Sequence, residues 1–362
     1  MRAPQDREAR RYDVLPGVRT TALPVSRCLW TEWSRRTFHN LDSAALSVLK
    51  GDVMPLQRLA VQSYLNTPGL VPADLSMVFL MREDDDTRAR PMPTLTVGEL
   101  PEAVQALVSL GVKSVKIFAG SGSRDACASQ AACATSLMAR SINAAKRAAS
   151  NLLVITETCV CSHNDSGECW LASDQGGMDL PRTIATLAAQ AVMQADAGAD
   201  IVGPAAMIPG SVRAVREALD GAGHGDVAVM PHLIFASSLY EGYRQSMGAA
   251  PRSGARLFQI APGRPEQAVH VAREMADEGA DMILTEPALH TVDTLVRLRN
   301  KVPVPLVPFS VSGEYLRLTD TRDDGGRDVT GLVEACTVLK RAGAARIITY
   351  GALEIARVLR GS

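Results

Sequence analysis

Three cysteines lie close together in the sequence, directly after a run of apolar residues. Cys159, Cys161 and Cys169 fall within eleven residues, and the apolar run LLVIT precedes them. Three thiolates on one loop can converge on a Zn²⁺ ion and leave a fourth coordination position open, which is the arrangement that a catalytic zinc needs. The other interpretation of the spacing is three buried cysteines with no metal. Three neighbours are candidate extra ligands or groups that support the ligands: Glu157, His163 and Glu168.

Lysine is scarce, which limits any chemistry that depends on an amine. The chain has 38 Lys and Arg residues together, and only six of these are lysines. A Schiff base to the protein therefore has six candidate positions. They are Lys50, Lys113, Lys116, Lys146, Lys301 and Lys340.

The segments that must position these groups alternate between two patterns. From about residue 57 onward, short runs rich in β-branched residues alternate with longer amphipathic segments such as residues 182–197, 266–278 and 332–341. This alternation predicts an α/β fold, a closed parallel (β/α)8 barrel. An open doubly wound sheet is the alternative, but no Gly-x-Gly-x-x-Gly turn follows the first strand. We expect eight strands, at residues 77–80, 114–118, 152–156, 201–204, 227–230, 282–285, 306–309 and 346–350.

An internal repeat supports the barrel and nominates positions in the active site. The segments SLGVKSVKIF, DAGADIVGPA, DEGADMILTE and RAGAARIITY each join a helix end, a glycine and a strand. The seventh residue after each glycine should lie at an equivalent strand tip, where such barrels build their active sites. These four residues are Phe118, Ala205, Glu286 and Tyr350.

Composition and charge restrict the partners and the location of the protein. The chain has 362 residues, 46% of them apolar, and a net charge of -1. A balanced charge does not favour nucleic acid or membrane surfaces as partners. No apolar run is long enough to span a bilayer, and the charged N-terminus does not resemble a signal peptide, so we expect a cytoplasmic protein. Seven cysteines in such a chain argue against a disulfide framework. Residues 1–56 are predicted to be an N-terminal arm, and residues 57–362 the barrel domain.

The Cys-x-Cys-x7-Cys loop after the third strand resembles the zinc loop of the porphobilinogen synthase family, also called delta-aminolevulinic acid dehydratase. The likeness runs from about residue 57 to the C-terminus. It includes, in family order, MPTLTV, VKIF, GADIVGPAAM, ASSLYEGYR, GADMILTEPAL, FSVSGEY and LKRAGAARIITY. The resemblance implies a (β/α)8 barrel, an N-terminal arm that embraces a neighbouring subunit, and a homo-oligomer, commonly an octamer.

The sequence departs from this family at its two reactive lysines. The family joins two molecules of 5-aminolevulinate through Schiff bases to two lysines. The first lysine position falls on Ile234 of HLIFASSLY, and the second falls on Glu286 of LTEPALH. A side chain without an amine cannot form an imine. The family's Pro-Ser-Asp-Met-Met-Asp-Gly-Arg segment is also altered, to PAAMIPGS at residues 204–211.

Residues that hold substrate carboxylates in the family have counterparts here. Arg244, with Arg256 and Gln259, matches the lid residues that bind one carboxylate. Ser312 and Tyr350 match those that bind the other. Arginine offers a planar fork to a carboxylate and hydroxyls donate single hydrogen bonds, so these types suit anionic acids.

The pattern predicts a zinc-dependent lyase or condensing enzyme for small amino or keto acids that lacks the family's two Schiff bases. Glu286 is the expected general acid or base, with Glu157 beside the metal. Two alternatives stay open: a non-catalytic homologue with a binding or assembly role, and a porphobilinogen synthase of tetrapyrrole biosynthesis.

Lys116 is a further candidate for catalysis. It lies two residues before Phe118 on one strand, so both side chains should point to the same side. The family resemblance places Phe118 at the substrate, which predicts that Lys116 points into the barrel one layer below. The alternative register turns Lys116 toward the helices, with its ammonium in solvent. An interior lysine would serve as a relocated amine or as a counter-charge.

Overall fold

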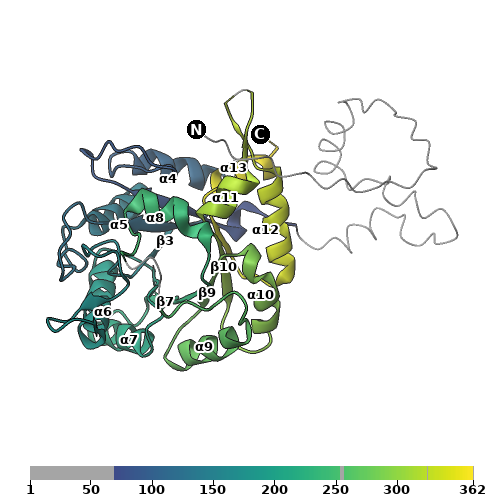
Figure 1. Ribbon diagram of the computed structural model, residues 1–362. Coiled ribbons are helices and arrows are strands. Elements are labelled where there is room, and N and C mark those ends of the chain that lie inside the picture. The colour runs from purple at the N-terminus through teal and green to yellow at the C-terminus, as the bar shows by residue number, and fades with distance from the viewer. Residues whose placement is uncertain (1–68, 253–256, 324, 362) are drawn as a thin grey trace, which may run out of the picture. The chain divides into compact units, whose positions relative to one another are not determined.

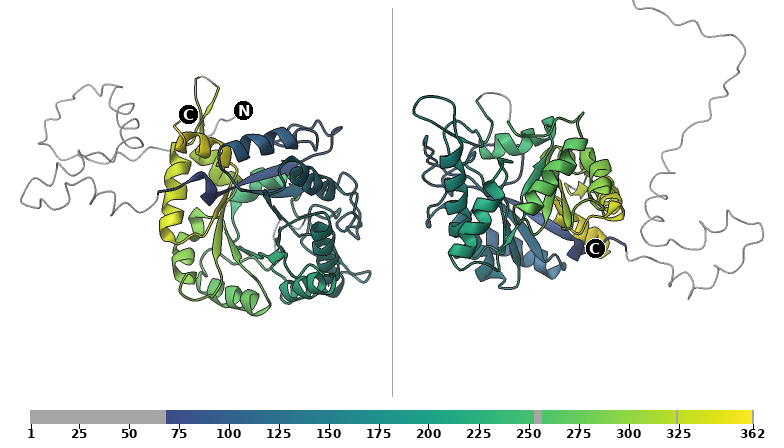
Figure 2. Two further views of the ribbon diagram at one scale, coloured as in Figure 1. Left: turned by 180° about the vertical axis from the view of Figure 1, so that it is seen from behind. Right: turned by 90° about the horizontal axis from the view of Figure 1, so that it is seen from below.

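The computed structural model describes residues 69–252, 257–323 and 325–361. Its main sheet contains nine strands in the order β7-β6-β3-β2-β1-β13-β10-β9-β8, and every pairing along it is parallel. The strands curl around a common centre and the helices cover their outer side (Figures 1 and 2). The predicted fold class, an α/β barrel, is confirmed.

The strands of the barrel are short and almost fully buried, because a parallel sheet is covered on both faces. In β2, for example, all six residues of SVKIFA are buried. The barrel strands are β1 (Leu75–Met81), β2 (Ser114–Ala119), β3 (Leu153–Thr156), β6 (Ile201–Val202), β7 (Ala228–Val229), β8 (His232–Ile234), β9 (Ile283–Glu286), β10 (Leu306–Ser310) and β13 (Ile347–Thr349).

The barrel closes through a strand that is interrupted near Pro231. On one side, the Met230 backbone N–H donates to the Val202 carbonyl oxygen at 2.8 Å. On the other side, the Leu284 N–H donates to the Pro231 carbonyl oxygen at 3.0 Å. Proline has no backbone N–H and cannot donate a hydrogen bond to a neighbouring strand. The strand is therefore divided into two segments, β7 and β8. Counted together, they make eight positions around the barrel.

Ten α-helices are present in the described residues, most of them on the outside of the barrel. Two begin with a side chain that caps the free N–H groups of the first turn: Ser136 accepts from the Ala139 N–H at 3.2 Å, and Asp179 from the Arg182 N–H at 3.0 Å. The helices are α4 (Leu100–Ser109), α5 (Leu137–Ala148), α6 (Leu180–Asp196), α7 (Ser211–Gly221), α8 (Glu241–Met247), α9 (Glu266–Asp277), α10 (Val292–Leu298), α11 (Ser312–Leu318), α12 (Thr330–Ala342) and α13 (Ala352–Leu359).

Short elements complete the connections. Three 3-10 turns occur in the described chain, and two small antiparallel ribbons lie outside the barrel. The turns are η2 (Pro72–Asp74), η3 (Ser238–Tyr240) and η4 (Leu289–Thr291), and the ribbons are β4 (Leu171–Ala172) with β5 (Met178–Asp179) and β11 (Asp320–Thr321) with β12 (Arg327–Asp328).

The repeated helix–glycine–strand unit is present as predicted. Gly111, Gly198, Gly279 and Gly343 have φ values of 85°, 102°, 102° and 113°. This left-handed conformation is open to glycine without a steric penalty, and it turns the chain from each helix toward its strand.

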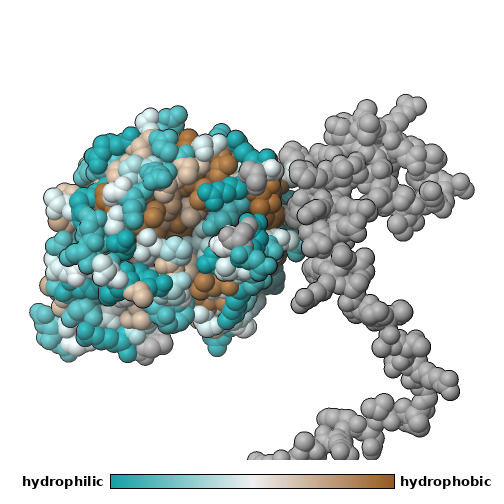
Figure 3. All heavy atoms as spheres, turned by 90° about the horizontal axis from the view of Figure 1, so that it is seen from above, coloured by the Kyte–Doolittle hydropathy of each residue, from teal (hydrophilic) through white to brown (hydrophobic). Residues whose placement is uncertain are grey.

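Most of the predicted elements agree with the structure within a few residues. The expected strands overlap β1, β2, β3, β6, β7, β9, β10 and β13. The strand β8 was missed, because proline at position 231 made the segment look like a strand end. The predicted arm, residues 1–56, lies outside the described residues. Within the described part of the chain, no helix has the length and apolarity to cross a membrane. Figure 3 shows one face of the molecule, on which hydrophilic residues alternate with smaller groups of apolar ones.

Candidate active site

A pocket opens at the carboxyl ends of the barrel strands. All four strand-tip residues nominated by the repeat line it: Phe118, Ala205, Glu286 and Tyr350. The strand tips are where (β/α)8 barrels place their active sites. The pocket is therefore the candidate active site.

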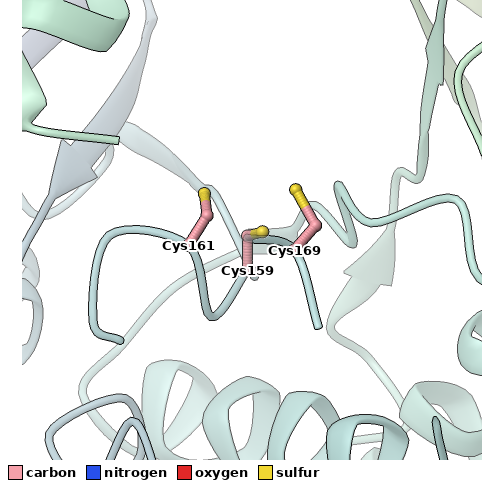
Figure 4. A group of neighbouring side chains, drawn as sticks. All are labelled: Cys159, Cys161 and Cys169. Atoms are coloured by element: carbon pink, nitrogen blue, oxygen red, sulfur yellow. The ribbon is translucent and has the colours of Figure 1, made fainter. Parts of the chain in front are cut away.

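One side of the pocket carries the three cysteines. Cys159, Cys161 and Cys169 line the pocket, and their Sγ atoms lie within 4.8 Å of one another. Their side chains project from one loop toward the same region (Figure 4). Contact with the sulfur atoms of Cys161 and Cys169, reinforced by burial, raises the pKa of the Cys159 thiol well above its usual range. A cation among the three sulfur atoms would favour the thiolate forms, so the donor set fits a thiophilic divalent metal.

Glu157 lies two residues before the first cysteine and is hydrogen-bonded to a tyrosine of α8. The Tyr243 hydroxyl donates to Glu157 Oε2 at 2.9 Å. Burial, with a further contribution from Cys161, raises the pKa of the Glu157 carboxyl to about 8, and Lys116 acts in the opposite direction. Tyr243 in turn packs edge-on against Phe118, with 5.1 Å between the ring centroids.

Lys116 points into the barrel, as predicted, and is completely buried. Its Nζ donates to the Thr156 carbonyl oxygen at 3.0 Å and lies 5.1 Å from the centre of the Phe118 ring. Burial lowers the pKa of Lys116 to about 8, against the attraction of Glu157 and Glu286. It is the only buried lysine among the described residues, and it lies beneath the pocket rather than among the residues that line it.

Glu286 lies opposite the cysteines and pairs with a histidine that the sequence analysis did not identify. His232 Nδ1 and Glu286 Oε1 are 2.9 Å apart, and both residues are buried. Burial, with the positive charge of Lys116, lowers the pKa of His232, while Glu286 opposes this shift. The imidazole is therefore neutral at physiological pH and donates its Nδ1 proton to the carboxylate.

Four of the residues expected to bind carboxylates line the pocket. Arg244, Gln259, Ser312 and Tyr350 all line it. The Arg244 guanidinium lies over the Tyr240 ring, 5.4 Å from its centre. Arg256 lies outside the described residues.

The two hydroxyls in this group differ in how they are bonded. The Tyr350 hydroxyl is buried and has no hydrogen-bond partner in the described structure. The Ser312 hydroxyl accepts from the Tyr243 N–H at 3.0 Å and donates to the Leu239 carbonyl oxygen at 3.1 Å. The Tyr350 hydroxyl is therefore available to donate a hydrogen bond to a ligand. The Ser312 hydroxyl instead connects α11 to α8 and η3.

The sequence carried a signal for His232 that was overlooked. It lies two residues before Ile234, and side chains alternate along a strand, so both point to the same side. Ile234 occupies the position of one of the family's two reactive lysines, so the same argument that placed Lys116 beneath Phe118 applies to His232. Tyr243 had no comparable signal, because its role depends on how α8 lies over the barrel.

Comparisons with known proteins give consistent results. A family model described as delta-aminolevulinic acid dehydratase matches residues 57–358. The chain is 33% identical over 311 residues to the delta-aminolevulinic acid dehydratase of Halalkalibacterium halodurans, covering 84% of this chain and 94% of that protein. It is 32% identical over 291 residues to the Escherichia coli protein of the same name, covering 78% and 90%. A crystal structure of the Toxoplasma gondii enzyme with its product porphobilinogen superposes with a TM-score of 0.77 at 28% identity, covering 86% of this chain and 92% of that one.

Proposed function

This chain belongs to the delta-aminolevulinic acid dehydratase family, a family of lyase-type enzymes, and we propose that it is a metal-dependent lyase or condensing enzyme for small amino or keto acids. The observation that carries this proposal is the composition of one pocket. Three thiols and Glu157 from the loop after β3, Glu286 from the end of β9, and Arg244 from α8 all line it. Such a pocket can bind a small acid by its carboxylate and move protons at its other end.

Cys159, Cys161 and Cys169 are the residues that would hold the metal. Thiolate ligands favour Zn²⁺ over Mg²⁺. When bound, such a cation polarises a carbonyl group or lowers the pKa of a bound water.

The chain's own residues supply binding, orientation and proton transfer. Arg244 and the Tyr350 hydroxyl bind carboxylate oxygens. The aromatic rings of Phe118 and Tyr243 exclude water from the bound substrate. Glu286 takes up or returns a proton at its carboxylate oxygens. Each of these groups already lines the pocket.

Two specific reactions fall within this function, and the comparisons favour one of them. The relatives at 30 to 33% identity share the name delta-aminolevulinic acid dehydratase and match over most of their length. This supports formation of porphobilinogen from 5-aminolevulinate in tetrapyrrole biosynthesis better than it supports a changed reaction. The changed reaction, without Schiff bases, is supported by the absence of any lysine among the residues that line the pocket.

The two reactions differ in what they require of Lys116. If this chain forms an imine with its substrate, Lys116 is the amine available in the barrel, and with a pKa of about 8 it is neutral in part near physiological pH. To do so, its amine must reach the pocket past Phe118. If no imine forms, Lys116 remains a counter-charge for Glu157 and Glu286.

Borohydride reduction in the presence of 5-aminolevulinate separates the two reactions. A covalent adduct mapped to Lys116, together with porphobilinogen in a colour test, identifies the family reaction. Consumption of substrate with no adduct identifies the changed reaction. No adduct can form at Ile234 or Glu286, because neither side chain has an amine. A chain that binds the metal but consumes no small amino or keto acid has the binding or assembly role instead.

Two further properties belong to this proposal. We expect the protein to act in the cytoplasm and to assemble as a homo-oligomer, with residues 1–56 contributing contacts between subunits. Light scattering of the full chain and of a variant that begins at residue 57 tests the assembly. An unchanged mass for the shortened chain would contradict the role of the arm.

A further inference from the structure

A charged layer at the floor of the pocket connects three strands of the barrel. Glu286 is the last residue of β9, and the strand register places it beside Ile234. His232 lies two residues before Ile234 on β8, beside Leu284, and so one position deeper in the barrel. Glu286 and His232 both line the pocket. Lys116 lies on β2, beneath Phe118, and does not line the pocket.

Gly203 allows the two basic groups to approach each other. A Cβ atom at this position would lie 3.0 Å from His232 Nε2 and 3.2 Å from Lys116 Nζ. Both nitrogens thus converge on one point beside the Gly203 backbone. His232 Nε2 is buried and has no hydrogen-bond partner in the described structure. An unpartnered nitrogen in a buried position has a cost in stability, which indicates that it is retained for another reason.

The charges of the three groups follow from this arrangement. A protonated imidazole would place a second positive charge beside Lys116, and burial also disfavours it, so both effects lower the pKa of His232. The neutral imidazole carries its proton on Nδ1, where Glu286 Oε1 accepts it at 2.9 Å. Across the layer, the Lys116 ammonium is therefore followed by the neutral His232 imidazole and then by the Glu286 carboxyl group.

We propose that His232 is a positioning residue for proton transfer by Glu286: its Nδ1–H orients the Glu286 carboxylate at the pocket, with Lys116 beneath as the balancing charge. This inference rests on the proposed function, because it deepens the role of Glu286 in the same pocket. In the step, a C–H bond beside the substrate carbonyl breaks, its proton moves to a Glu286 carboxylate oxygen, and the electron pair stays on the substrate as an enolate. His232 keeps its Nδ1 proton throughout.

The titratable groups that face His232 and Glu286 are the same in every variant compared below. They are Lys116 from β2, Glu157 and Cys161 from the loop after β3, Tyr240 from η3 and Tyr350 after β13.

Deuterium exchange into a small keto acid tests the proposal without requiring a complete reaction. The probe is levulinate in D₂O, and proton NMR follows the loss of the signal from the carbon beside the ketone. Binding of levulinate is measured separately, from the shift in thermal unfolding temperature. The variants are Glu286→Gln, His232→Leu and His232→Asn, because an asparagine amide can donate from near the Nδ1 position. His270→Asn is the matched control, since it disrupts an exposed His–Glu pair on α9, 3.2 Å in length.

We expect Glu286→Gln to slow exchange by roughly 100-fold or more. His232→Leu should slow it about tenfold while levulinate still binds, because the Glu286 carboxylate loses the donor that orients it. His232→Asn should restore the rate to within about threefold of wild type, and His270→Asn should leave the rate unchanged.

Three results would overturn the inference. The first is a His232→Leu variant that is folded and keeps the wild-type exchange rate. The second is a His232→Asn variant as slow as His232→Leu, which would mean that the imidazole itself carries the proton. The third is exchange that survives Glu286→Gln. Wild-type protein that binds levulinate but exchanges nothing contradicts proton transfer by Glu286, whereas wild-type protein that does not bind levulinate counts against the proposed function as well.

Discussion

The two sides of the pocket are built in different ways. The cysteine side comes from one loop, in which three thiols within a segment of eleven residues bring their Sγ atoms within 4.8 Å of one another. The charged side comes from three separate strands, and His232 and Glu286 are 54 positions apart. The first arrangement depends mainly on local sequence, and the second depends on how the barrel closes.

This difference predicts how each side responds to change. Removing a ligand on the cysteine side should affect the metal and leave the barrel intact, because the loop lies above the sheet. Removing a group on the charged side should alter stability, because buried charges are compensated by one another and not by solvent. The variants below test this division.

The largest effect is expected on the cysteine side. A triple Cys→Ser variant at positions 159, 161 and 169 should reduce the zinc content from about one ion per chain to none, because serine hydroxyls are poor ligands for this ion. Elemental analysis of the purified protein measures it. Cys336→Ser, a buried cysteine on α12, is the matched control and should keep its metal. Zinc content that is unchanged in the triple variant would end the metal-site assignment.

On the charged side, Lys116→Met should change how stability depends on pH. The pKa of Lys116 is about 8 when folded and near 10.5 when unfolded, so the unfolded chain binds more protons in that window. The contribution of Lys116 to stability therefore rises with pH, by ~3 kcal/mol between pH 8 and 10.5. Urea unfolding of both proteins measures the difference. Parallel pH profiles for wild type and Lys116→Met would show that the lysine is not buried in the barrel.

Gly203→Ala should destabilise the barrel. Its Cβ would lie 2.7 Å from the Thr156 carbonyl oxygen and would separate His232 from Lys116. Overpacking of this kind costs ~2 kcal/mol. Gly263→Ala is the control, because no atom lies within 4 Å of its added Cβ. If the two variants are equally stable, His232 and Lys116 can be moved apart without loss of stability, and the prediction is wrong.

The smallest effect is expected at Tyr350, which lies between the two sides. Tyr350→Phe removes a buried hydroxyl that has no partner in the described structure, so stability should stay within ~0.5 kcal/mol of wild type. If this hydroxyl binds a substrate carboxylate, KM should rise about tenfold with little change in kcat. An unchanged KM would remove Tyr350 from the binding site.

The barrel and the strand tips were predictable from the sequence because their signals are local and repeated. Gly111, Gly198, Gly279 and Gly343 mark equivalent turns, and counting seven residues from each gives four residues that line the pocket. Strand β8 was not predicted, because Pro231 breaks the pattern that identifies a strand.

The charged side was predictable only in part. Alternation along β2 placed Lys116 inside the barrel, but nothing in the sequence relates His232 to Glu286. Their contact depends on β8 pairing with β9 in one register, which is a property of the closed barrel. The unpartnered Nε2 of His232 likewise emerges only when Gly203 and Lys116 are placed beside it.

The proposed function, a metal-dependent lyase or condensing enzyme for small amino or keto acids, is tested most directly by the consumption of 5-aminolevulinate. Mass spectrometry follows this consumption with zinc-loaded wild type and the triple Cys→Ser variant side by side. We predict that wild type consumes the substrate and that the triple variant, still folded by circular dichroism, does so at least ~100-fold more slowly. Equal consumption by the two proteins, or none by wild type, would contradict the claim.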